Sequence, residues 1–254
     1  MMRTAIAALG TALTITGCAS TASVESGEVY DPFEGFNRTM YGFNDEVDKA
    51  VLGPVAMGYR AVTNEPVRNG VSNFLTNLNQ PVVFSNAVLQ GKPYTALDTL
   101  GRFLVNTTVG IGGIFDPATA AGVPKHNEDF GQTLGYWGVP DGAYLVLPFF
   151  GSSNIRDAAG MGVDNVFDPL NWATFEGDTA FRVSRTAVGV VSIRERFDDA
   201  IELVRDQPEP YTFLRRNYSQ SRQAAIRDGE ELEDPFANLP DFEDYDFGDE
   251  FEEE

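Results

Sequence analysis

Apolar residues recur at steps of three and four along the chain just after residue 30, and this spacing predicts an amphipathic helix. Its apolar stripe consists of Phe33, Phe36, Met40, Phe43 and Val47. Asp31 is a residue type that caps helices, Pro32 suits the first helical position, and Glu34 completes a capping box by reaching back to the cap. We therefore expect this helix to begin at Asp31.

The same periodicity predicts further helices. Pro66 opens a second helix, Pro81 ends it, and an apolar segment at 82–89 follows. A third helix begins after Lys92, with a core stripe formed by Leu97, Leu100 and Leu104. Later helices are expected at 154–166, 178–205 and 210–227, with a break at Asp168-Pro169.

Two apolar stretches contain too much glycine for a stable helix or strand. One is Val109–Phe115, and the other is an extended loop between Asp129 and Gly151 that includes Tyr144–Phe150. The sequence has no βαβ alternation, no dinucleotide or nucleotide phosphate motif and no internal repeat. The predicted fold class is mainly α, with a single helical domain at residues 31–227.

Several features favour a domain that lies in a membrane interface. Phe dominates the aromatic residues, with 19 Phe against 9 Tyr and 2 Trp, and several segments are amphipathic. For any single Phe, a place in a water-soluble core is the better expectation. No apolar run approaches the roughly 20 residues that a spanning helix needs. We therefore expect the body to lie in one leaflet without crossing the bilayer.

The first 17 residues have the layout of a secretory signal peptide, with Arg3 near the start, an apolar stretch at 5–15 and small residues before the only cysteine, Cys18. The ending Ile-Thr-Gly-Cys resembles the lipobox of bacterial lipoproteins. That resemblance implies a diacylglycerol and an N-acyl chain on Cys18, and no other cofactor is expected. An ordinary signal peptide with a stray cysteine is the alternative.

The residue after the cysteine bears on the destination. In the lipoproteins that the lipobox resembles, Asp at this position favours the inner membrane, whereas this chain has Ala19. We expect a lipoprotein of the outer membrane, on the inner leaflet and facing the periplasm. Residues 18–30 are then a flexible linker between the lipidated cysteine and the helical domain.

The net charge of −20 is concentrated at the C-terminus, where residues 228–254 contain fourteen acidic and no basic residues. The other 24 acidic and 18 basic residues leave a charge of −6 for the rest of the chain. Such a tail cannot bury enough apolar surface to fold alone, so we expect it to be disordered, as a solvated terminus or as an arm that docks a basic partner. Nucleic acid is excluded as a partner because it requires a basic face.

Five motifs occur in one order along the chain. They are Asp31–Asn44 (DPFEGFNRTMYGFN), Gly101–Gly110 (GRFLVNTTVG), Asp129–Gly135 (DFGQTLG), Tyr144–Pro148 (YLVLP), and Pro210-Tyr211 with Arg215 and Tyr218. Together they resemble the MlaA (VacJ) family of outer-membrane lipoproteins over residues 31–222. Glu209 stands where members often have Asp, and the acidic tail is longer and more aromatic than the family pattern.

The resemblance implies a ring of helices in the inner leaflet of the outer membrane, with a central amphipathic pore. It implies removal of phospholipids from the outer leaflet, transfer to a soluble periplasmic carrier, and docking to a trimeric porin. Without a P-loop, transport would be passive. Candidates for the polar pore wall that binds headgroups are Asn37, Arg38, Asn44, Arg102, Asn106 and Gln132. For each, a helix cap or an internal hydrogen bond is an equal alternative.

Other elements have candidate roles in such a pore. The stretches 109–115 and 144–150 are candidates for its apolar rim, and the glycines at Gly110, Gly112 and Gly113 for a hinge, with a tight turn as the alternative. A structural lipoprotein that braces a porin would need no pore. A lipid hydrolase would need the single histidine, His126, but no G-x-S-x-G or HExxH motif accompanies it. We expect no enzyme and no metal.

Overall fold

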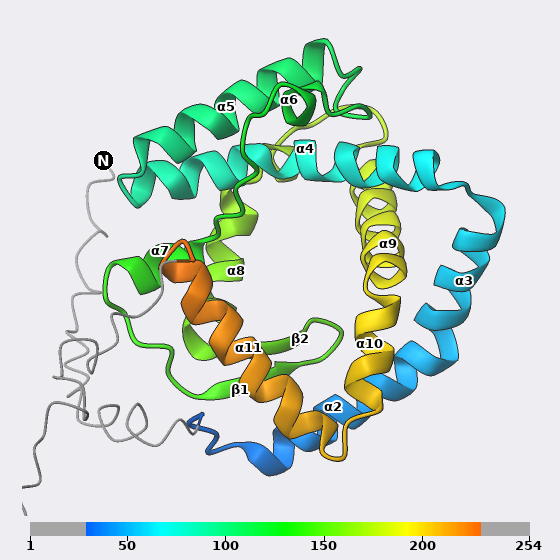
Figure 1. Ribbon diagram of the computed structural model, residues 1–254, viewed down its shortest axis with the longest axis vertical. Helices are drawn as coiled ribbons and strands as arrows, with labels where there is room; N and C mark the ends of the chain where they lie inside the picture. Colours follow the sequence, from blue (N-terminus) through cyan, green and yellow to red (C-terminus); the bar gives the residue numbers. More distant parts are fainter. Residues whose placement is uncertain (1–28, 230–254) are drawn as a thin grey trace, which may run out of the picture.

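The computed structural model describes residues 29–229, which are mainly helical. The expected signal peptide at 1–17, Cys18, all but the end of the linker at 18–30, and all but the first two residues of the acidic tail lie outside the described residues. The helices form a ring, and neighbouring elements around it contact one another (Figure 1). This arrangement confirms the predicted fold class.

The first helical segment is longer than its apolar stripe, and it begins later than predicted. Helix α2 (Glu34–Val47) continues through a π-helical turn, η1 (Asp48–Leu52), into α3 (Gly53–Val62). The predicted cap at Asp31 is wrong, because its carboxylate accepts hydrogen bonds from Asn37 Nδ2 and Arg215 Nη1, each 2.8 Å long. Packing between distant parts of the chain has replaced the local capping box.

Helix α4 (Glu65–Leu89) passes through the position where the sequence predicts its end. Pro81 lies inside it, although proline removes a backbone donor. The following turns bury Val82, Val83 and Ala87, and α4 packs along α5 (Pro93–Thr108). Burial of this face keeps the chain helical through the proline, so the separate segment at 82–89 does not exist.

The orientation of α5 is opposite to the prediction. The stripe of Leu97, Leu100 and Leu104 is exposed, and the buried positions of the helix are Ala96, Thr99, Arg102 and Asn106. Periodicity identifies an apolar face but does not say whether that face meets protein. In this helix the polar face lies against the rest of the protein.

The region predicted as an extended loop contains a helix and a hairpin. After the short α6 (Pro117–Ala120), helix α7 (Phe130–Tyr136) begins at a cap provided by Asp129. Strands β1 (Tyr144–Leu147) and β2 (Gly151–Asn154) pair antiparallel, with Tyr144 opposite Asn154 and Leu147 opposite Gly151. The extended conformation was therefore predicted correctly for 144–147, whereas α7 was missed.

Helix α8 (Ile155–Phe167) ends where predicted, and the 3-10 turn η2 (Pro169–Asn171) follows. Helices α7 and α8 cross at Gly131 and Gly160, where a Cβ on Gly160 would overlap the backbone of Gly131. The single long helix expected at 178–205 is divided at Phe197 into α9 (Asp178–Arg196) and α10 (Asp198–Arg205). Helix α11 (Pro210–Ile226) agrees with the prediction.

The ring closes through contacts between elements that are distant in sequence. Helix α4 contacts α9, α9 contacts α3, α2 contacts β1, and α11 contacts both β2 and α7. A small core of Tyr144, Val146 and Tyr211 lies where the hairpin meets α2 and α11. No helix between residues 29 and 229 has both the length and the apolar character needed to cross a bilayer.

Candidate functional site

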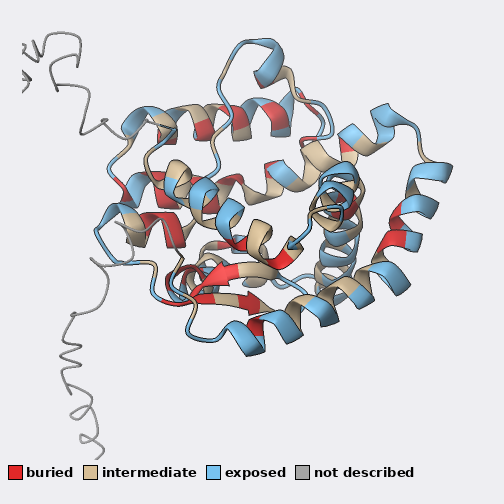
Figure 2. Ribbon diagram, turned by 60° about the horizontal axis from the view of Figure 1, so that its bottom comes forward, coloured by how far each residue is buried: buried red, intermediate tan, exposed pale blue. Residues whose placement is uncertain are grey.

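The side chains buried in this ring are mostly polar. Among the residues with less than a tenth of their surface exposed, Asn, Gln, Thr, Asp and Arg outnumber the apolar side chains. Buried positions occur on several elements of the ring and on both strands of the hairpin (Figure 2). Many bulky apolar side chains are exposed instead, on several elements of the ring. Those with at least half of their surface exposed include Phe36, Val51, Met57, Val62, Leu97, Leu104, Val109, Ile111, Phe115, Phe149, Phe150, Trp172, Val183 and Ile193. The distribution is the reverse of that in a water-soluble domain.

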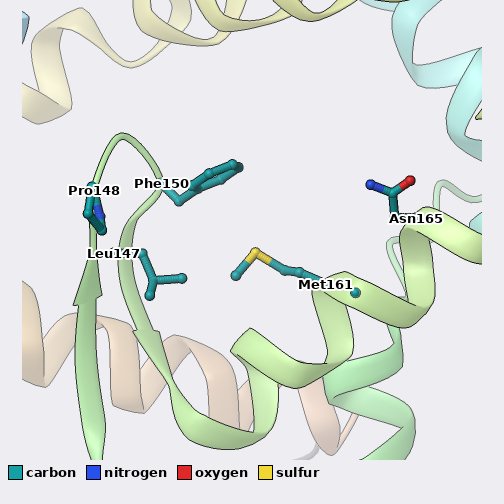
Figure 3. A pocket seen from close by; sticks show the side chains of 6 residues that line it. Leu147, Pro148, Phe150, Met161 and Asn165 are labelled. Atoms are coloured by element: carbon teal, nitrogen blue, oxygen red, sulfur yellow. The ribbon is translucent and has the colours of Figure 1, made fainter.

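An open cavity of about 430 Å³ lies between the hairpin and α8. We call it the hairpin cavity, and it is lined by Leu147, Pro148, Phe150, Met161, Gly162 and Asn165. Figure 3 shows Leu147, Phe150 and Met161 reaching into the space from its two sides, with the amide of Asn165 farther along α8. The cavity is thus apolar at the hairpin and polar at one end, which suits an amphipathic ligand.

Two asparagines of α2 hold the hairpin in place. Asn37 is fully buried; its Nδ2 donates to Tyr144 O at 2.9 Å, and its Oδ1 accepts from Val146 N at 2.8 Å. Asn44, two turns later, donates to Leu147 O at 2.9 Å and accepts from Phe149 N at 2.8 Å. Both are among the predicted headgroup ligands, and both use their amides on the backbone of β1 and its turn, as the alternative of an internal hydrogen bond describes.

Arg38 lies on the exposed face of α2. Its Nε donates to Glu34 at 2.7 Å, its Nη1 lies 3.5 Å from Glu209, and its guanidinium stacks over the ring of Tyr211 at 4.5 Å. The side chain is about half exposed. Among the six headgroup candidates, it is therefore the most accessible to a solute.

Arg102 and Asn106 converge on one carboxylate, that of Asp116. Arg102 Nη2 lies 2.8 Å from both oxygens of Asp116, and Asn106 Nδ2 donates to the same group at 3.0 Å. Burial alone would raise the pKa of Asp116, but hydrogen bonds from Thr119, Lys125 and Asn106 hold it well below its usual range. These contacts tie the C-terminal half of α5 to α6 and leave Arg102 only 3% exposed.

Gln132 is the remaining candidate, and it lies in the first turn of α7. Its Nε2 donates to Asn127 O and to Asp129 Oδ2, both at 3.0 Å. Burial would raise the pKa of Asp129, but its ion pair with Arg222 outweighs that effect and lowers it. The six candidates are thus spread over three helices and are not gathered in one site. Their role as headgroup ligands remains a prediction.

The glycines predicted as a hinge form a tight turn after α5. Gly112 and Gly113 have positive φ angles of 70° and 96°, and Gly112 O accepts a hydrogen bond from Asn77 Nδ2 at 3.3 Å. A Cβ at Gly113 would overlap the side chain of Asn77, and one at Gly110 would overlap backbone atoms. The alternative of a tight turn describes this loop; the hinge movement itself remains a prediction.

Sequence reasoning missed the carboxylates that fasten α11 to the ring. Asp31 accepts hydrogen bonds from Tyr211 Oη and Arg215, while Asp157 accepts from Tyr218 Oη at 2.5 Å. Burial and the neighbouring carboxylates raise the pKa of both tyrosines above their usual value. The motif Pro210-Tyr211 with Arg215 and Tyr218 was visible in the sequence, but its partners lie more than sixty residues away or at the opposite end of the domain.

His126, the residue that a hydrolase would need, has a carboxylate partner. Its Nε2 lies 3.0 Å from Asp98 Oδ2, and no serine hydroxyl is bonded to it in the part of the chain that the structure describes. Nor do residues 29–229 contain a group of His, Cys, Asp and Glu side chains arranged to hold a metal ion.

Known proteins resemble this chain over nearly its whole length. Proteins named intermembrane phospholipid transport system lipoprotein MlaA, from Shigella flexneri and from Escherichia coli (strain K12), are each 39% identical to it over 235 residues, which cover 91% of this chain and 91% of the relative. The protein of the same name from Haemophilus influenzae is 34% identical over 243 residues, 94% of this chain and 96% of the relative.

The fold also has a solved counterpart. A structure described as "Structural basis for maintenance of bacterial outer membrane lipid asymmetry" matches with a TM-score of 0.68 and 36% identity, covering 77% of this chain and 98% of that chain. The family described as MlaA lipoprotein matches residues 29–225. The chain thus belongs to the MlaA lipoprotein family.

Proposed function

We propose that this protein is an outer-membrane lipoprotein that forms a passive amphipathic channel for phospholipids. It removes phospholipids that have strayed into the outer leaflet, passes them to a soluble periplasmic carrier, and so maintains the lipid asymmetry of the outer membrane. The observation that carries this proposal is the reversed distribution of side chains, with polar groups buried in the ring and apolar groups on its surface. The names of the relatives, which describe intermembrane phospholipid transport, support it.

The physical problem of such transport is the lipid headgroup. Moving an unpaired charge into hydrocarbon is very costly, whereas acyl chains prefer apolar surroundings. A wet passage with polar groups on one side and apolar groups on the other removes both penalties. The hairpin cavity has this mixed character, with Leu147, Phe150 and Met161 near the hairpin and the Asn165 amide along α8.

The exposed apolar surface supports the proposed location. Acyl chains around the ring would cover side chains such as Leu97, Val109 and Phe115, which would be unfavourable in water. The described helices are not of the kind that spans a bilayer, so we propose that the ring lies in the inner leaflet, anchored by acyl chains on Cys18 and facing the periplasm. A porin trimer and a soluble lipid carrier are the proposed partners.

Filling the hairpin cavity tests the channel. Gly162 lines the cavity, and a Cβ built on it would meet no atom within 4 Å, so Gly162→Phe adds a ring to the cavity with little strain elsewhere. We expect cells that carry only this variant to accumulate phospholipid in the outer leaflet. An outer-leaflet acyltransfer assay measures that lipid directly.

Gly58→Phe is the matched control, because Gly58 is also helical and unobstructed but lies on α3, away from the cavity. It should restore low outer-leaflet phospholipid to cells that lack the protein. Association with the porin is measured in parallel, since a protein that only braces a porin would keep its function with the cavity filled. Normal lipid asymmetry with Gly162→Phe therefore contradicts the channel.

A further inference from the structure

A second cavity lies behind the hairpin turn. It measures about 280 Å³, is partly open, and is lined by residues of α2, η1, α10, α11 and the hairpin. We call it the α2–α10 cavity. Its apolar wall includes Val47, Leu52, Val146, Ile201, Val204 and Leu214. Protein pockets that bind small ligands measure about 300–1,000 Å³, so this volume suits one narrow apolar group rather than a whole lipid.

One end of the α2–α10 cavity is charged. Arg205 donates from Nε to Asp45 Oδ1 and from Nη2 to Asp48 Oδ2, both at 2.8 Å. Within residues 29–229, Nη1 of Arg205 has no hydrogen-bond partner. The half-exposed ammonium of Lys49 lies 2.6 Å from Asp45 on the same side. A guanidinium that keeps a free N–H beside an apolar cavity suits a phosphate whose acyl chain enters the cavity.

The two cavities share one residue, Phe150. Its side chain lines both of them and is 77% exposed. In Figure 3 its ring extends from the hairpin into open space and is not packed among its labelled neighbours. An acyl chain in the hairpin cavity therefore lies against a ring that also lines the α2–α10 cavity.

We propose that the α2–α10 cavity is a holding site for one acyl chain of a glycerophospholipid, with the phosphate of that lipid bound by Arg205. The inference rests on the proposed function, because the ligand is the lipid that the channel moves. Each methylene that leaves water adds to the affinity, so even part of an acyl chain gains from the apolar wall. The second acyl chain of the same lipid remains outside this cavity.

The test uses phospholipids that carry a photoreactive diazirine at the end of one acyl chain. Phosphatidylethanolamine and phosphatidylglycerol probes are incubated with membranes that contain the full-length lipidated protein, and the labelled peptides are mapped. We expect label from both probes on α10, around Ile201 and Val204. Val204→Trp fills the cavity and should reduce this label about tenfold, which corresponds to about 1.4 kcal/mol.

Leu203→Trp is the matched control, because Leu203 is the neighbouring residue of α10 but is 57% exposed. It should leave the label on α10 unchanged. Label on α8 near Met161, in the hairpin cavity, shows that the Val204→Trp protein is folded and still receives lipid. A diazirine-bearing palmitate probe separates phospholipid from free fatty acid.

Three results would overturn the inference. They are equal labelling of α10 in the wild type and in Val204→Trp, labelling of α10 by palmitate alone, and label that reaches α8 but never α10. Each of them leaves the channel proposal intact if Gly162→Phe still disturbs lipid asymmetry. Failure of the channel proposal is recognised by a different result, since the amount of outer-leaflet phospholipid then stays normal in Gly162→Phe cells.

Discussion

Two apolar turns of this ring look alike in sequence but are held in different ways. The glycine-rich loop at Val109–Phe115 and the hairpin turn at 148–150 each expose a bulky residue in the left-handed conformation, Ile111 with φ 54° and Phe149 with φ 67°. The loop is fixed by close packing, since a Cβ at Gly113 would overlap the side chain of Asn77 and one at Gly110 would overlap backbone atoms. The hairpin turn is fixed mainly by the amide of Asn44 and has a cavity on each side.

Similar apolar patterns can therefore form either a tightly packed turn or an accessible surface. In the loop, glycine is the residue that cannot be replaced. In the hairpin, two asparagines of α2 satisfy backbone groups that the short strands leave unpaired. Substitutions should therefore be most harmful at glycines on one side of the ring and at asparagines on the other.

The largest effect is expected at the base of the hairpin. Asn37→Ala removes three hydrogen bonds and leaves the carbonyl of Tyr144 and the amide of Val146 buried without partners. Because each unsatisfied buried group costs about 1–3 kcal/mol, we expect the free energy of unfolding to fall by about 4 kcal/mol. Thermal unfolding in detergent measures the loss, and a fall of less than about 1 kcal/mol would contradict the proposed role of this amide.

The next effect distinguishes two neighbouring glycines of the loop. Gly113→Ala combines a positive φ with overlap against Asn77, so we expect a loss of about 3 kcal/mol. Gly112→Ala has a positive φ but open space around the new Cβ, and about 1 kcal/mol should be lost. Equal losses in the two variants would show that packing does not fix the loop.

A smaller loss is expected at the tip of the hairpin. Asn44 is only partly buried, so water can replace part of what Asn44→Ala removes, and about 1.5 kcal/mol should be lost. Hydrogen exchange at the amide of Phe149 should become faster, while that of Val146 stays slow because Asn37 still holds it. Faster exchange at both amides would mean that the hairpin opens as one unit.

Replacing the left-handed residue by glycine should raise the stability of the protein in one turn but not in the other. Ile111→Gly relieves a conformation that costs a side chain about 1–2 kcal/mol, so stability should rise by about 1 kcal/mol. Phe149→Gly relieves the same strain but also loses the edge-to-face contact with Phe43, whose centroid lies 5.4 Å away. We expect no gain from that variant, and equal gains would argue against the contact.

The smallest expected effect is on the stability of the protein at low pH. The pKa of Asp116 is lower in the folded protein than its usual value near 4, so the stabilisation is present above that pH and is lost as the pH falls toward the lowered pKa. Asp116→Asn should flatten the fall in melting temperature between about pH 4 and pH 3. A wild-type curve that is equally flat would contradict the pKa shift.

The sequence predicts the elements of this fold better than their orientation. Turn residues and periodicity locate α8 and α11 correctly, yet the Leu97 stripe of α5 was predicted as core and is exposed. Hydropathy alone cannot tell a face that meets protein from one that meets lipid. Pro81 likewise ends a helix by local rules, but burial against α5 keeps α4 continuous.

The candidate site was less predictable than the fold. The sequence offers Asn37 and Asn44 as candidates for a polar pore wall, but their backbone partners in β1 lie more than a hundred residues away. No local pattern reveals such a pairing. The lining of the hairpin cavity, including Met161 and Asn165, depends in the same way on how α8 lies against the hairpin.

The central claim is that water reaches the cavity inside the ring, while lipid or a partner protein covers the apolar surface outside it. Cys18 is the only cysteine, so with its thiol acylated an introduced cysteine is the only free thiol. Asn165→Cys and Leu97→Cys are both exposed positions, and a charged maleimide reacts only where water admits it. In isolated outer membranes we predict that Asn165→Cys is labelled and that Leu97→Cys is labelled only after denaturation in SDS; equal labelling of both in intact membranes would contradict the account.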